Sequence, residues 1–224
     1  MANTVKKSAH RPPPQGSAGR PVDPDKDAAI LAAARHILFE RGPQAVTMEA
    51  VAAEAGVSKA TVYSRHANKT ELIRAVVRHH GQRIVGHFAA APGSHDDVRA
   101  SLGGFARQLL DFLSSDEHIM LVRAAGSAQA LAPDMVREIY INGPQNTLEQ
   151  LAQWLGNAAA ARLLDCPEPL RSAELLMGML CGIDWARTLF GLPPAHRGAR
   201  LDEHADFVVD AFLQLHGPDS PRER

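Results

Sequence analysis

The sequence of 224 residues contains few aromatic residues, only two cysteines and no long apolar run. Aromatic residues make up only 5%, whereas 45% of the residues are hydrophobic, and many of these are alanine. This balance favours closely packed helices over a β-sandwich, whose strands are rich in Val, Ile, Thr and Tyr. No stretch approaches the roughly 20 apolar residues that span a bilayer, and the polar segment 1–22 lacks the apolar core of a secretory signal. We therefore expect an all-α, cytoplasmic protein without a membrane partner.

Residues arranged for enzyme chemistry are equally sparse. The two cysteines, Cys166 and Cys181, are too few for a disulfide framework or a four-cysteine zinc site. None of the 11 histidines belongs to a His-x3-His pair. The chain has neither a Gly-rich phosphate loop nor a Gly-x-Ser-x-Gly motif. We predict that the protein is not an enzyme and that it holds no metal and no cofactor.

The net charge of −1 is unevenly distributed along the chain. Residues 1–69 contain ten Lys and Arg against six Asp and Glu, and residues 70–224 contain fourteen against nineteen. A basic first part on an acidic remainder is typical of a protein that touches phosphates at one end.

Composition and periodicity divide the chain into four segments. The first is rich in Pro, Gly, Ser, Lys and Arg, and it is either a passive leader or an arm that follows a DNA groove through Lys6, Lys7, Arg11 and Arg20. Apolar residues at helical spacing follow it. We predict a disordered basic tail at 1–22, a helix-turn-helix domain at 23–70, a helical effector-binding and dimerisation domain at 71–217, and a disordered tail at 218–224.

Residues 46–72 predict two short helices joined by a tight turn. Thr47 is placed as the N-cap of the first helix and Ser58 as the N-cap of the second. Gly56 ends the first helix, because a left-handed turn costs least in a residue without a Cβ. A capping box at Asn68 starts the helix that follows. Helix, glycine turn and helix in this order are the signature of a helix-turn-helix motif.

The second of these helices has one inward apolar residue, Val62, and is otherwise polar. Its first turn, with Ser58, Ala60 and Thr61, can offer Lys59 to guanine acceptors in a major groove and small side chains to a thymine methyl. Helix amides, hydroxyls and cations are suited to phosphate oxygens. We assign contacts with the DNA backbone to Thr47, Tyr63, Arg65, His66 and Lys69.

The stretch AAILAAARHILFERGPQAVTMEAVAAEAGVSKATVYSRHANKTELIRAV resembles the N-terminal domain of TetR/AcrR-family transcriptional regulators. In that family a helix ending in Gly is followed by the pattern T…IA..AGVS..TlY.yF..K..L. This chain supplies Gly42, Thr47, Ala55-Gly56-Val57-Ser58, Thr61-Val62-Tyr63, Lys69 and Leu72.

The resemblance also implies a role for single residues. Phosphates would be held by Thr47, Tyr63 and Lys69, and bases would face Lys59, Ala60, Thr61 and Ser64. The chain departs from the family in one segment, where Arg65-His66-Ala67-Asn68-Lys69 replaces an aromatic pair followed by Pro or Gly. His66 stands where the family has an anchoring Phe, and Arg65 adds a charge near the DNA backbone.

Beyond residue 69 the periodicity predicts helices near 69–90, 95–114, 116–131, 134–162, 169–190 and 202–216. Residues 144–193 are similar to the C-terminal domain of the AefR-like branch of the family. The last two helices have broad apolar faces, and part of each face must also serve the protein's own core. Two such helices from each of two chains would form a four-helix bundle and hence a homodimer. We assign to this interface Leu176, Leu180, Phe207, Val208, Ala211, Phe212 and Leu215.

An unknown small-molecule effector is expected to bind among the helices of the second domain. Met and aromatic side chains suit an apolar, adaptable cavity. Arg123 lies in the apolar run IMLVRAAG, where it needs an acidic partner, a ligand or a route to solvent. The candidate pocket residues are Phe105, Leu109, Phe112, Met120, Arg123, Trp154, Met177, Cys181 and Trp185.

The sequence thus predicts a homodimeric, sequence-specific DNA-binding regulator. It would be a repressor that a small, largely apolar ligand releases from a palindromic, double-stranded DNA operator. The alternative is a helical protein-interaction module, or a degenerate family member that does not bind DNA. Lys59, Arg65 and Lys69 favour DNA, whereas His66 favours the alternative.

Overall fold

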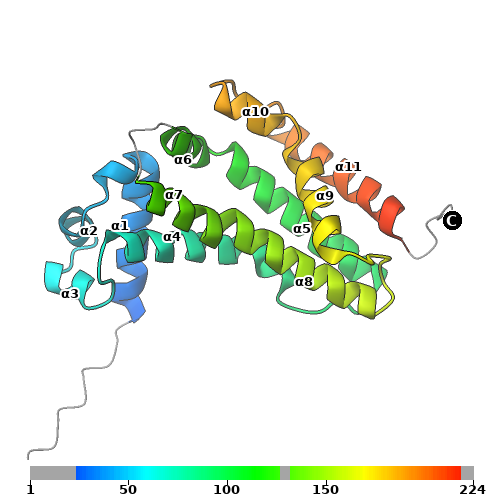
Figure 1. Cartoon of the computed structure of the whole chain (residues 1–224), viewed down its shortest axis with the longest axis horizontal. Coiled ribbons are helices and arrows are strands. Elements are labelled where there is room, and N and C mark those ends of the chain that lie inside the picture. The colour runs from blue at the N-terminus through cyan, green and yellow to red at the C-terminus, as the bar shows by residue number, and fades with distance from the viewer. Residues whose placement is uncertain (1–23, 127–131, 218–224) are drawn as a thin grey trace, which may run out of the picture.

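The structure is a computed structural model that describes residues 24–126 and 132–217. Every regular element in these two ranges is helical, which confirms the all-α prediction. Figure 1 shows a small N-terminal unit at one end of an elongated molecule and longer helices behind it. The elements are α1 (Pro24–Glu40), η1 (Pro43–Ala45), α2 (Met48–Glu54), α3 (Lys59–Tyr63), α4 (Lys69–Ile84), η2 (Val85–Phe88), α5 (His95–Ser114), α6 (Asp116–Gly126), α7 (Pro133–Tyr140), η3 (Ile141–Gln145), α8 (Asn146–Ala160), α9 (Pro169–Cys181), α10 (Asp184–Leu189) and α11 (Ala199–His216).

The N-terminal unit, which we call the head, is built around α1. This helix presents Ile30, Ile37 and Leu38 to α2, α3 and α4, and all three side chains are buried. Val51 of α2 and Val62 of α3 close the same core. Burying side chains of this size contributes about 1.5–3 kcal/mol each, so the two short helices are held by packing rather than by their own propensity.

The remaining helices, which we call the body, enclose a second core. Its largest buried side chains come from α5, α8, α9 and α11 and include Phe105, Leu155, Leu176 and Phe212. Trp154 of α8 is buried among them, and its indole Nε1 donates a hydrogen bond of 3.0 Å to the carbonyl oxygen of Ala90.

Helix α4 belongs to both units. Its first half buries Leu72, Ile73 and Val76 in the head core, and Ile84 at its end is part of the body core. The head core also includes Met135 of α7. Head and body are therefore joined by a shared helix and by shared packing.

Three of the expected helices differ from the structure. The helix expected at 134–162 is α7, one π-helical turn and α8, because Pro144 lacks an N–H and cannot continue the α-helical ladder. The helix expected at 169–190 breaks at Gly182, whose φ of 45° leaves the helical region. Helix α4 ends at Ile84 and continues only as a 3-10 turn to Phe88.

Candidate nucleic-acid interface

The helix-turn-helix is formed by α2, a turn at Gly56 and α3, at the outer end of the head (Figure 1). The hydroxyl of Thr47 accepts a hydrogen bond of 3.1 Å from the amide of Ala50. Gly56 has a φ of 65°, in the left-handed region. The hydroxyl of Ser58 accepts a hydrogen bond of 3.1 Å from the amide of Thr61. The local features predicted for this motif are therefore present.

Helix α3 attaches to the head through a single buried residue. Val62 is fully buried, whereas Ser58, Lys59, Ala60, Tyr63 and Ser64 are all exposed. A helix with so little of its surface inside is held by its caps and by one apolar contact. The rest of its surface is available to a partner.

Lys59 is engaged within the protein. Its ammonium forms an ion pair with the carboxylate of Glu49 on α2 and lies 5.7 Å from the centre of the Tyr63 ring. The hydrogen bond with Glu49 raises the pKa of Lys59, and the same bond lowers the pKa of Glu49. Because both side chains are more than half exposed, separating the ion pair costs little free energy. Lys59 can therefore exchange Glu49 for an acceptor on DNA.

Arg65 contacts α1 rather than extending into solvent. Its guanidinium donates to the carboxylate of Asp27, and only 16% of its side chain is exposed. This contact fixes the end of α3 to α1, a link that the sequence did not indicate.

His66 and Lys69 lie partly buried at the turn between α3 and α4. Burial lowers the pKa of His66 and also the pKa of Lys69. The amide of Glu71 donates a hydrogen bond of 2.9 Å to the side-chain oxygen of Asn68, which confirms the cap predicted at the start of α4.

The pocket residues predicted in the body are not all at one site. Phe105, Leu109 and Trp154 are buried in the body core, and Met177 packs against it. Phe112 lies between the rings of His80 and His118, and Met120 is exposed. The side chain of Arg123 lies outside the described residues, as do Lys6, Lys7, Arg11 and Arg20. Only Cys181 and Trp185 line the cavity found among the described residues.

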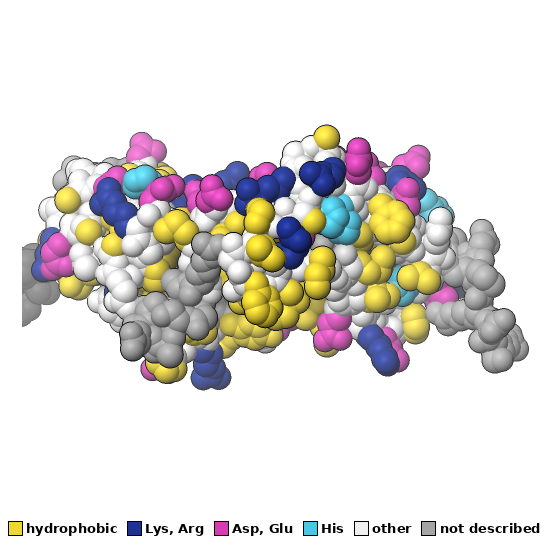
Figure 2. Space-filling view, turned by 90° about the horizontal axis from the view of Figure 1, so that it is seen from above, with side chains coloured by type: hydrophobic (Ala, Val, Ile, Leu, Met, Phe, Trp, Pro, Cys, Tyr) yellow, Lys and Arg dark blue, Asp and Glu magenta, His cyan; other side chains and the backbone are white. Residues whose placement is uncertain are grey.

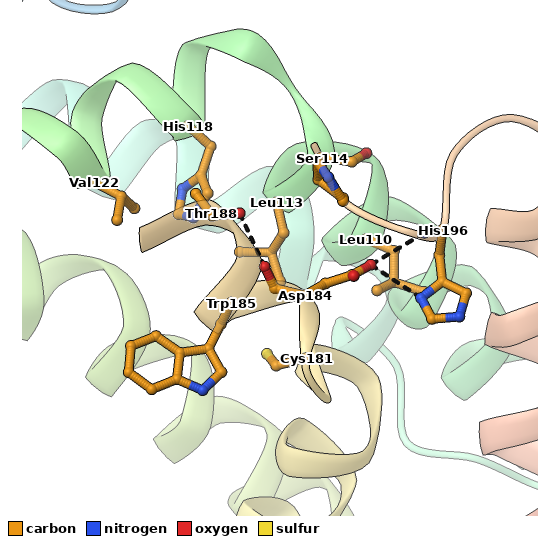
Figure 3. A pocket seen from close by; sticks show the side chains of 11 residues that line it. Leu110, Leu113, Ser114, His118, Val122, Cys181, Asp184, Trp185, Thr188 and His196 are labelled. Carbon is orange, nitrogen blue, oxygen red and sulfur yellow. Dashed lines mark hydrogen bonds and ion pairs between the residues drawn. The ribbon is translucent and has the colours of Figure 1, made fainter. Parts of the chain in front are cut away.

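That cavity has a volume of about 130 Å³. Figure 3 shows Asp184 hydrogen-bonded to His196 at one end of the lining, with His118 and Val122 on α6 away from them. The lining side chains are Leu110, Leu113, Ser114, His118, Val122, Cys181, Asp184, Trp185, Thr188, Pro194 and His196. Most of them were not predicted, because periodicity marks an apolar helix face without saying which helices meet around a cavity.

The residues predicted for a dimer interface divide into two groups. Leu176, Leu180, Val208 and Phe212 are buried in the core of their own chain, so assigning them to the interface was wrong. Amphipathic periodicity marks a buried face without saying whether its partner is in the same chain. Phe207 and Leu215 are well exposed and Ala211 is partly exposed, and the three share the outer face of α11.

Exposed apolar side chains also lie on α9, on α10 and on the residues beside α10. Figure 2 shows hydrophobic side chains gathered near the middle of the molecule when it is seen from above, in the region of α10. The exposed residues are Leu170, Leu175, Ile183, Trp185, Leu189, Phe190 and Leu192. Patches of this kind mark sites of association more often than plain surface.

Two other features of the described ranges bear on function. No group of three or more His, Cys, Asp and Glu side chains is placed to hold a metal ion within 24–126 and 132–217. Among the same residues, no helix has the length and apolar character to cross a membrane.

Comparison with protein families matches both units of the chain. The model described as "Bacterial regulatory proteins, tetR family" matches residues 30–76. The model described as "AefR-like transcriptional repressor, C-terminal domain" matches residues 100–218.

Curated relatives match over part of their length. The transcriptional activator FasR of Mycolicibacterium smegmatis is 29% identical over 118 residues, which is 52% of this chain and 54% of that protein. The DNA-binding transcriptional repressor TetR of Mycobacteroides abscessus is 35% identical over 83 residues, 37% of this chain and 44% of that protein. The chain thus spans about half the length of these relatives.

Solved structures match this chain over most of its length. A TetR-family regulator from Mesorhizobium loti is 27% identical, with a TM-score of 0.66 over 86% of this chain and 96% of its own. The flavonoid-responsive regulator FrrA is also 27% identical, with a TM-score of 0.61 over 88% of this chain and 100% of its own.

Proposed function

Because the chain belongs to the TetR family of transcriptional regulators, which bind DNA and are not enzymes, we propose that α3 is the helix that reads the operator. The observation that carries this proposal is the surface of α3, where one residue is buried and the polar side chains face outward. Bases would face Lys59, Ala60, Thr61 and Ser64, and the DNA backbone would meet Thr47, Ser58, Tyr63, Arg65, His66 and Lys69.

The protein would act as a homodimer. Phe207, Ala211 and Leu215 follow one another at intervals of four residues on the outer face of α11, and Leu175 is exposed on the neighbouring α9. Paired with their copies around a two-fold axis, α9 and α11 would form a four-helix bundle. The two α3 helices would then meet half-sites of a palindrome about one DNA turn, roughly 34 Å, apart.

We expect repression rather than activation, released by a small, largely apolar ligand. Support comes from the AefR-like repressor model, which matches half of the chain, although the relative FasR is an activator. The similar structure FrrA is a regulator that responds to flavonoids. In this chain the ligand would bind in the cavity of the body rather than at the buried positions Phe105, Leu109 and Trp154.

The signal from such a ligand would pass through the contacts between head and body. Arg35 of α1 donates to Glu117 of α6 at 2.5 Å, and Arg74 of α4 donates to Glu138 of α7 at 2.6 Å. A ligand that prefers one arrangement of these helices by about 1–3 kcal/mol would weaken operator binding roughly 5–150-fold.

The test is selection of random duplex DNA with the purified protein, followed by salt titrations on the enriched sequence. We expect a palindrome and a steep fall of affinity with salt, because phosphate contacts release counterions. Lys59→Ala should relax the sequence preference at one position of each half-site, with a loss of about 1–3 kcal/mol in discrimination. Tyr63→Phe should weaken binding to all sequences alike, as expected for loss of a phosphate contact.

A matched control is Arg99→Ala, which removes an exposed, ion-paired cation from the body. This variant should keep the preference of the natural chain. If no sequence is enriched and all binding is weak and insensitive to sequence, the DNA-reading role of α3 fails. The exposed face of α3 would then serve another protein, the alternative that the sequence left open.

A further inference from the structure

We propose that the cavity between α5, α6 and α10 binds one uncharged aromatic ring bearing a hydroxyl group, such as a simple phenol, and that the ligand acts on the head through α6. The inference rests on the proposed ligand response and names the chemistry of that ligand.

The size of the cavity sets the size of the ligand. Its volume is about 130 Å³, and an engineered protein cavity of roughly 150 Å³ accepts benzene. One six-membered ring with a small substituent therefore fits without movement of the walls. The walls include Leu110, Leu113, Val122 and the indole of Trp185, which are suited to an apolar ring.

The charge of the lining excludes an anion. None of the lining side chains is Lys or Arg, and Asp184 is the carboxylate among them. Burial favours the protonated acid, but hydrogen bonds from the amides of Ala195 and His196 and from the His196 ring outweigh it and lower the pKa of Asp184. The carboxylate is therefore ionised at neutral pH, and the lining offers no Lys or Arg to pair with a ligand carboxylate or phosphate.

The same geometry gives a cation little advantage. Asp184 already accepts from Ala195 at 2.8 Å and from His196 at 3.0 and 3.1 Å. The Nε of Arg187 lies 3.8 Å from Oδ1, the oxygen that accepts from Ala195, and partly offsets the charge of the carboxylate. The lining therefore favours an uncharged ligand over an anion or a cation.

His118 supplies the polar group that selects a hydroxyl. Its ring lines the cavity, and its buried Nδ1 has no hydrogen-bond partner among the described residues. Burial, with a smaller effect of His80, lowers the pKa of His118 to about 4, so the ring is neutral at pH 7. A neutral imidazole carries one donor and one acceptor nitrogen. A phenolic hydroxyl can donate to or accept from an imidazole nitrogen, so it suits a neutral ring in the wall of the cavity.

His118 also connects the cavity to the head. Its neighbour on α6, Glu117, accepts the hydrogen bond from Arg35 of α1. On its other side the His118 ring packs 4.7 Å from the ring of Phe112, which packs 4.2 Å from that of His80 on α4. A ligand that shifts His118 therefore disturbs contacts with both long helices of the head.

The test is calorimetric titration of the full chain with phenol, toluene and benzoate, three rings of similar size. We expect phenol to bind about tenfold more tightly than toluene, the value of one net hydrogen bond, and benzoate not to bind. His118→Leu should abolish the preference for phenol over toluene. Val122→Phe, which fills the cavity while retaining every polar group, should block both ligands.

Equal affinities for phenol and toluene, binding of benzoate, or phenol binding that survives Val122→Phe would each overturn the inference. Phenol should also weaken binding to the selected operator. If an operator is found but phenol does not bind, only the ligand class is wrong. If phenol binds but no operator can be selected, the proposed regulatory function fails and the site remains.

Discussion

At the scale of single residues, the interface proposed for DNA contains a carboxylate that competes with DNA for Lys59. Lys59 forms an ion pair with Glu49, so DNA would have to displace this carboxylate before the lysine could contact a base or phosphate. Glu49 would then remain beside the DNA as an unpaired negative charge. In the proposed complex the pair would lower attraction to DNA in general and leave sequence-dependent contacts to decide binding.

Glu49→Gln should therefore increase affinity for non-specific DNA more than affinity for the operator. The logarithm of the binding constant should fall more steeply with the logarithm of salt concentration, by about one unit of slope. Fluorescence anisotropy with operator and scrambled duplexes measures both quantities.

The matched control is Glu54→Gln. Glu54 is another carboxylate of α2, but it pairs with Arg41 and His36 of the head and not with Lys59. If both variants change the salt slope equally, Glu49 has no special role.

A second residue-scale prediction concerns the buried ring of His118. Its pKa is about 4 in the folded chain against an ordinary value of 6.5. Between these values the unfolded chain binds more protons, so stability is complete above pH 6.5 and is lost as the pH falls toward 4. The loss from this ring is on the order of 2 kcal/mol. Urea denaturation of the natural chain at pH 7 and pH 5 should reveal it.

In His118→Leu the free energy of unfolding should fall less between these two pH values. His80 would keep part of the dependence, because burial, with the charge of Arg35 second, lowers the pKa of His80 to about 4 as well. His95→Leu makes the same change at an exposed position and should follow the natural chain. Parallel curves for all three proteins would contradict the assignment.

Residue-scale features were predictable where they depend on near neighbours. The caps at Thr47, Ser58 and Asn68 act over three residues and were read correctly from the sequence. Arg65 and Asp27 are 38 positions apart, and no local pattern connects them. The same holds for the partnerless Nδ1 of His118, whose burial depends on how α6 packs against other helices.

At the scale of elements, the turn between α2 and α3 depends on a residue without a Cβ. A Cβ added at Gly56 would meet no atom within 4 Å, so the cost of a side chain there lies in the backbone alone. Gly56→Ala should lower the free energy of unfolding by about 1–2 kcal/mol. Thermal and urea denaturation measure this loss.

The matched control is Gly86→Ala in η2. A Cβ there also meets open space, and the backbone does not have a positive φ. This variant should be neutral or slightly stabilising, since alanine restricts the unfolded chain. A similar loss in both variants would show that the left-handed turn is not the cause.

Helix existence was predictable from periodicity, and helix breaks were not. The apolar stripe runs through Pro144 because a π-helical turn keeps α7 and α8 nearly continuous. Gly182 breaks its helix because the chain must turn into α10, and this requirement comes from tertiary packing. As a result the sequence predicted Trp185 of α10 as a pocket residue but not Asp184, Thr188 or the loop residues Pro194 and His196.

At the scale of the whole molecule, the proposed dimer predicts a sharp effect of charge on α11. Phe207 is 69% exposed and sits on the outer stripe with Ala211 and Leu215. Phe207→Glu should convert the dimer to monomers without changing the helical content, because two carboxylates would face each other across the axis. Analytical ultracentrifugation and circular dichroism test both parts.

The control is Tyr140→Glu, which charges an exposed aromatic position on α7 outside this stripe. It should leave the association state unchanged. If the natural chain is itself monomeric, or if Tyr140→Glu also dissociates it, the outer face of α11 is not the interface. Loss of the dimer should also weaken operator binding, since each half-site would be bound alone.

The sharing of α4 between two cores limits how this protein can exchange parts during evolution. A head cut at residue 70 would leave behind Ile73, Val76 and Val77, which close its core, and also Met135 from a helix some sixty positions away. Recombination that joins a new head to an old body must therefore carry α4 along and preserve the surface that receives α7. If α3 reads the operator as proposed, the preferred sequence could change through exposed α3 side chains alone, whereas exchange of an entire head demands matching changes in the body.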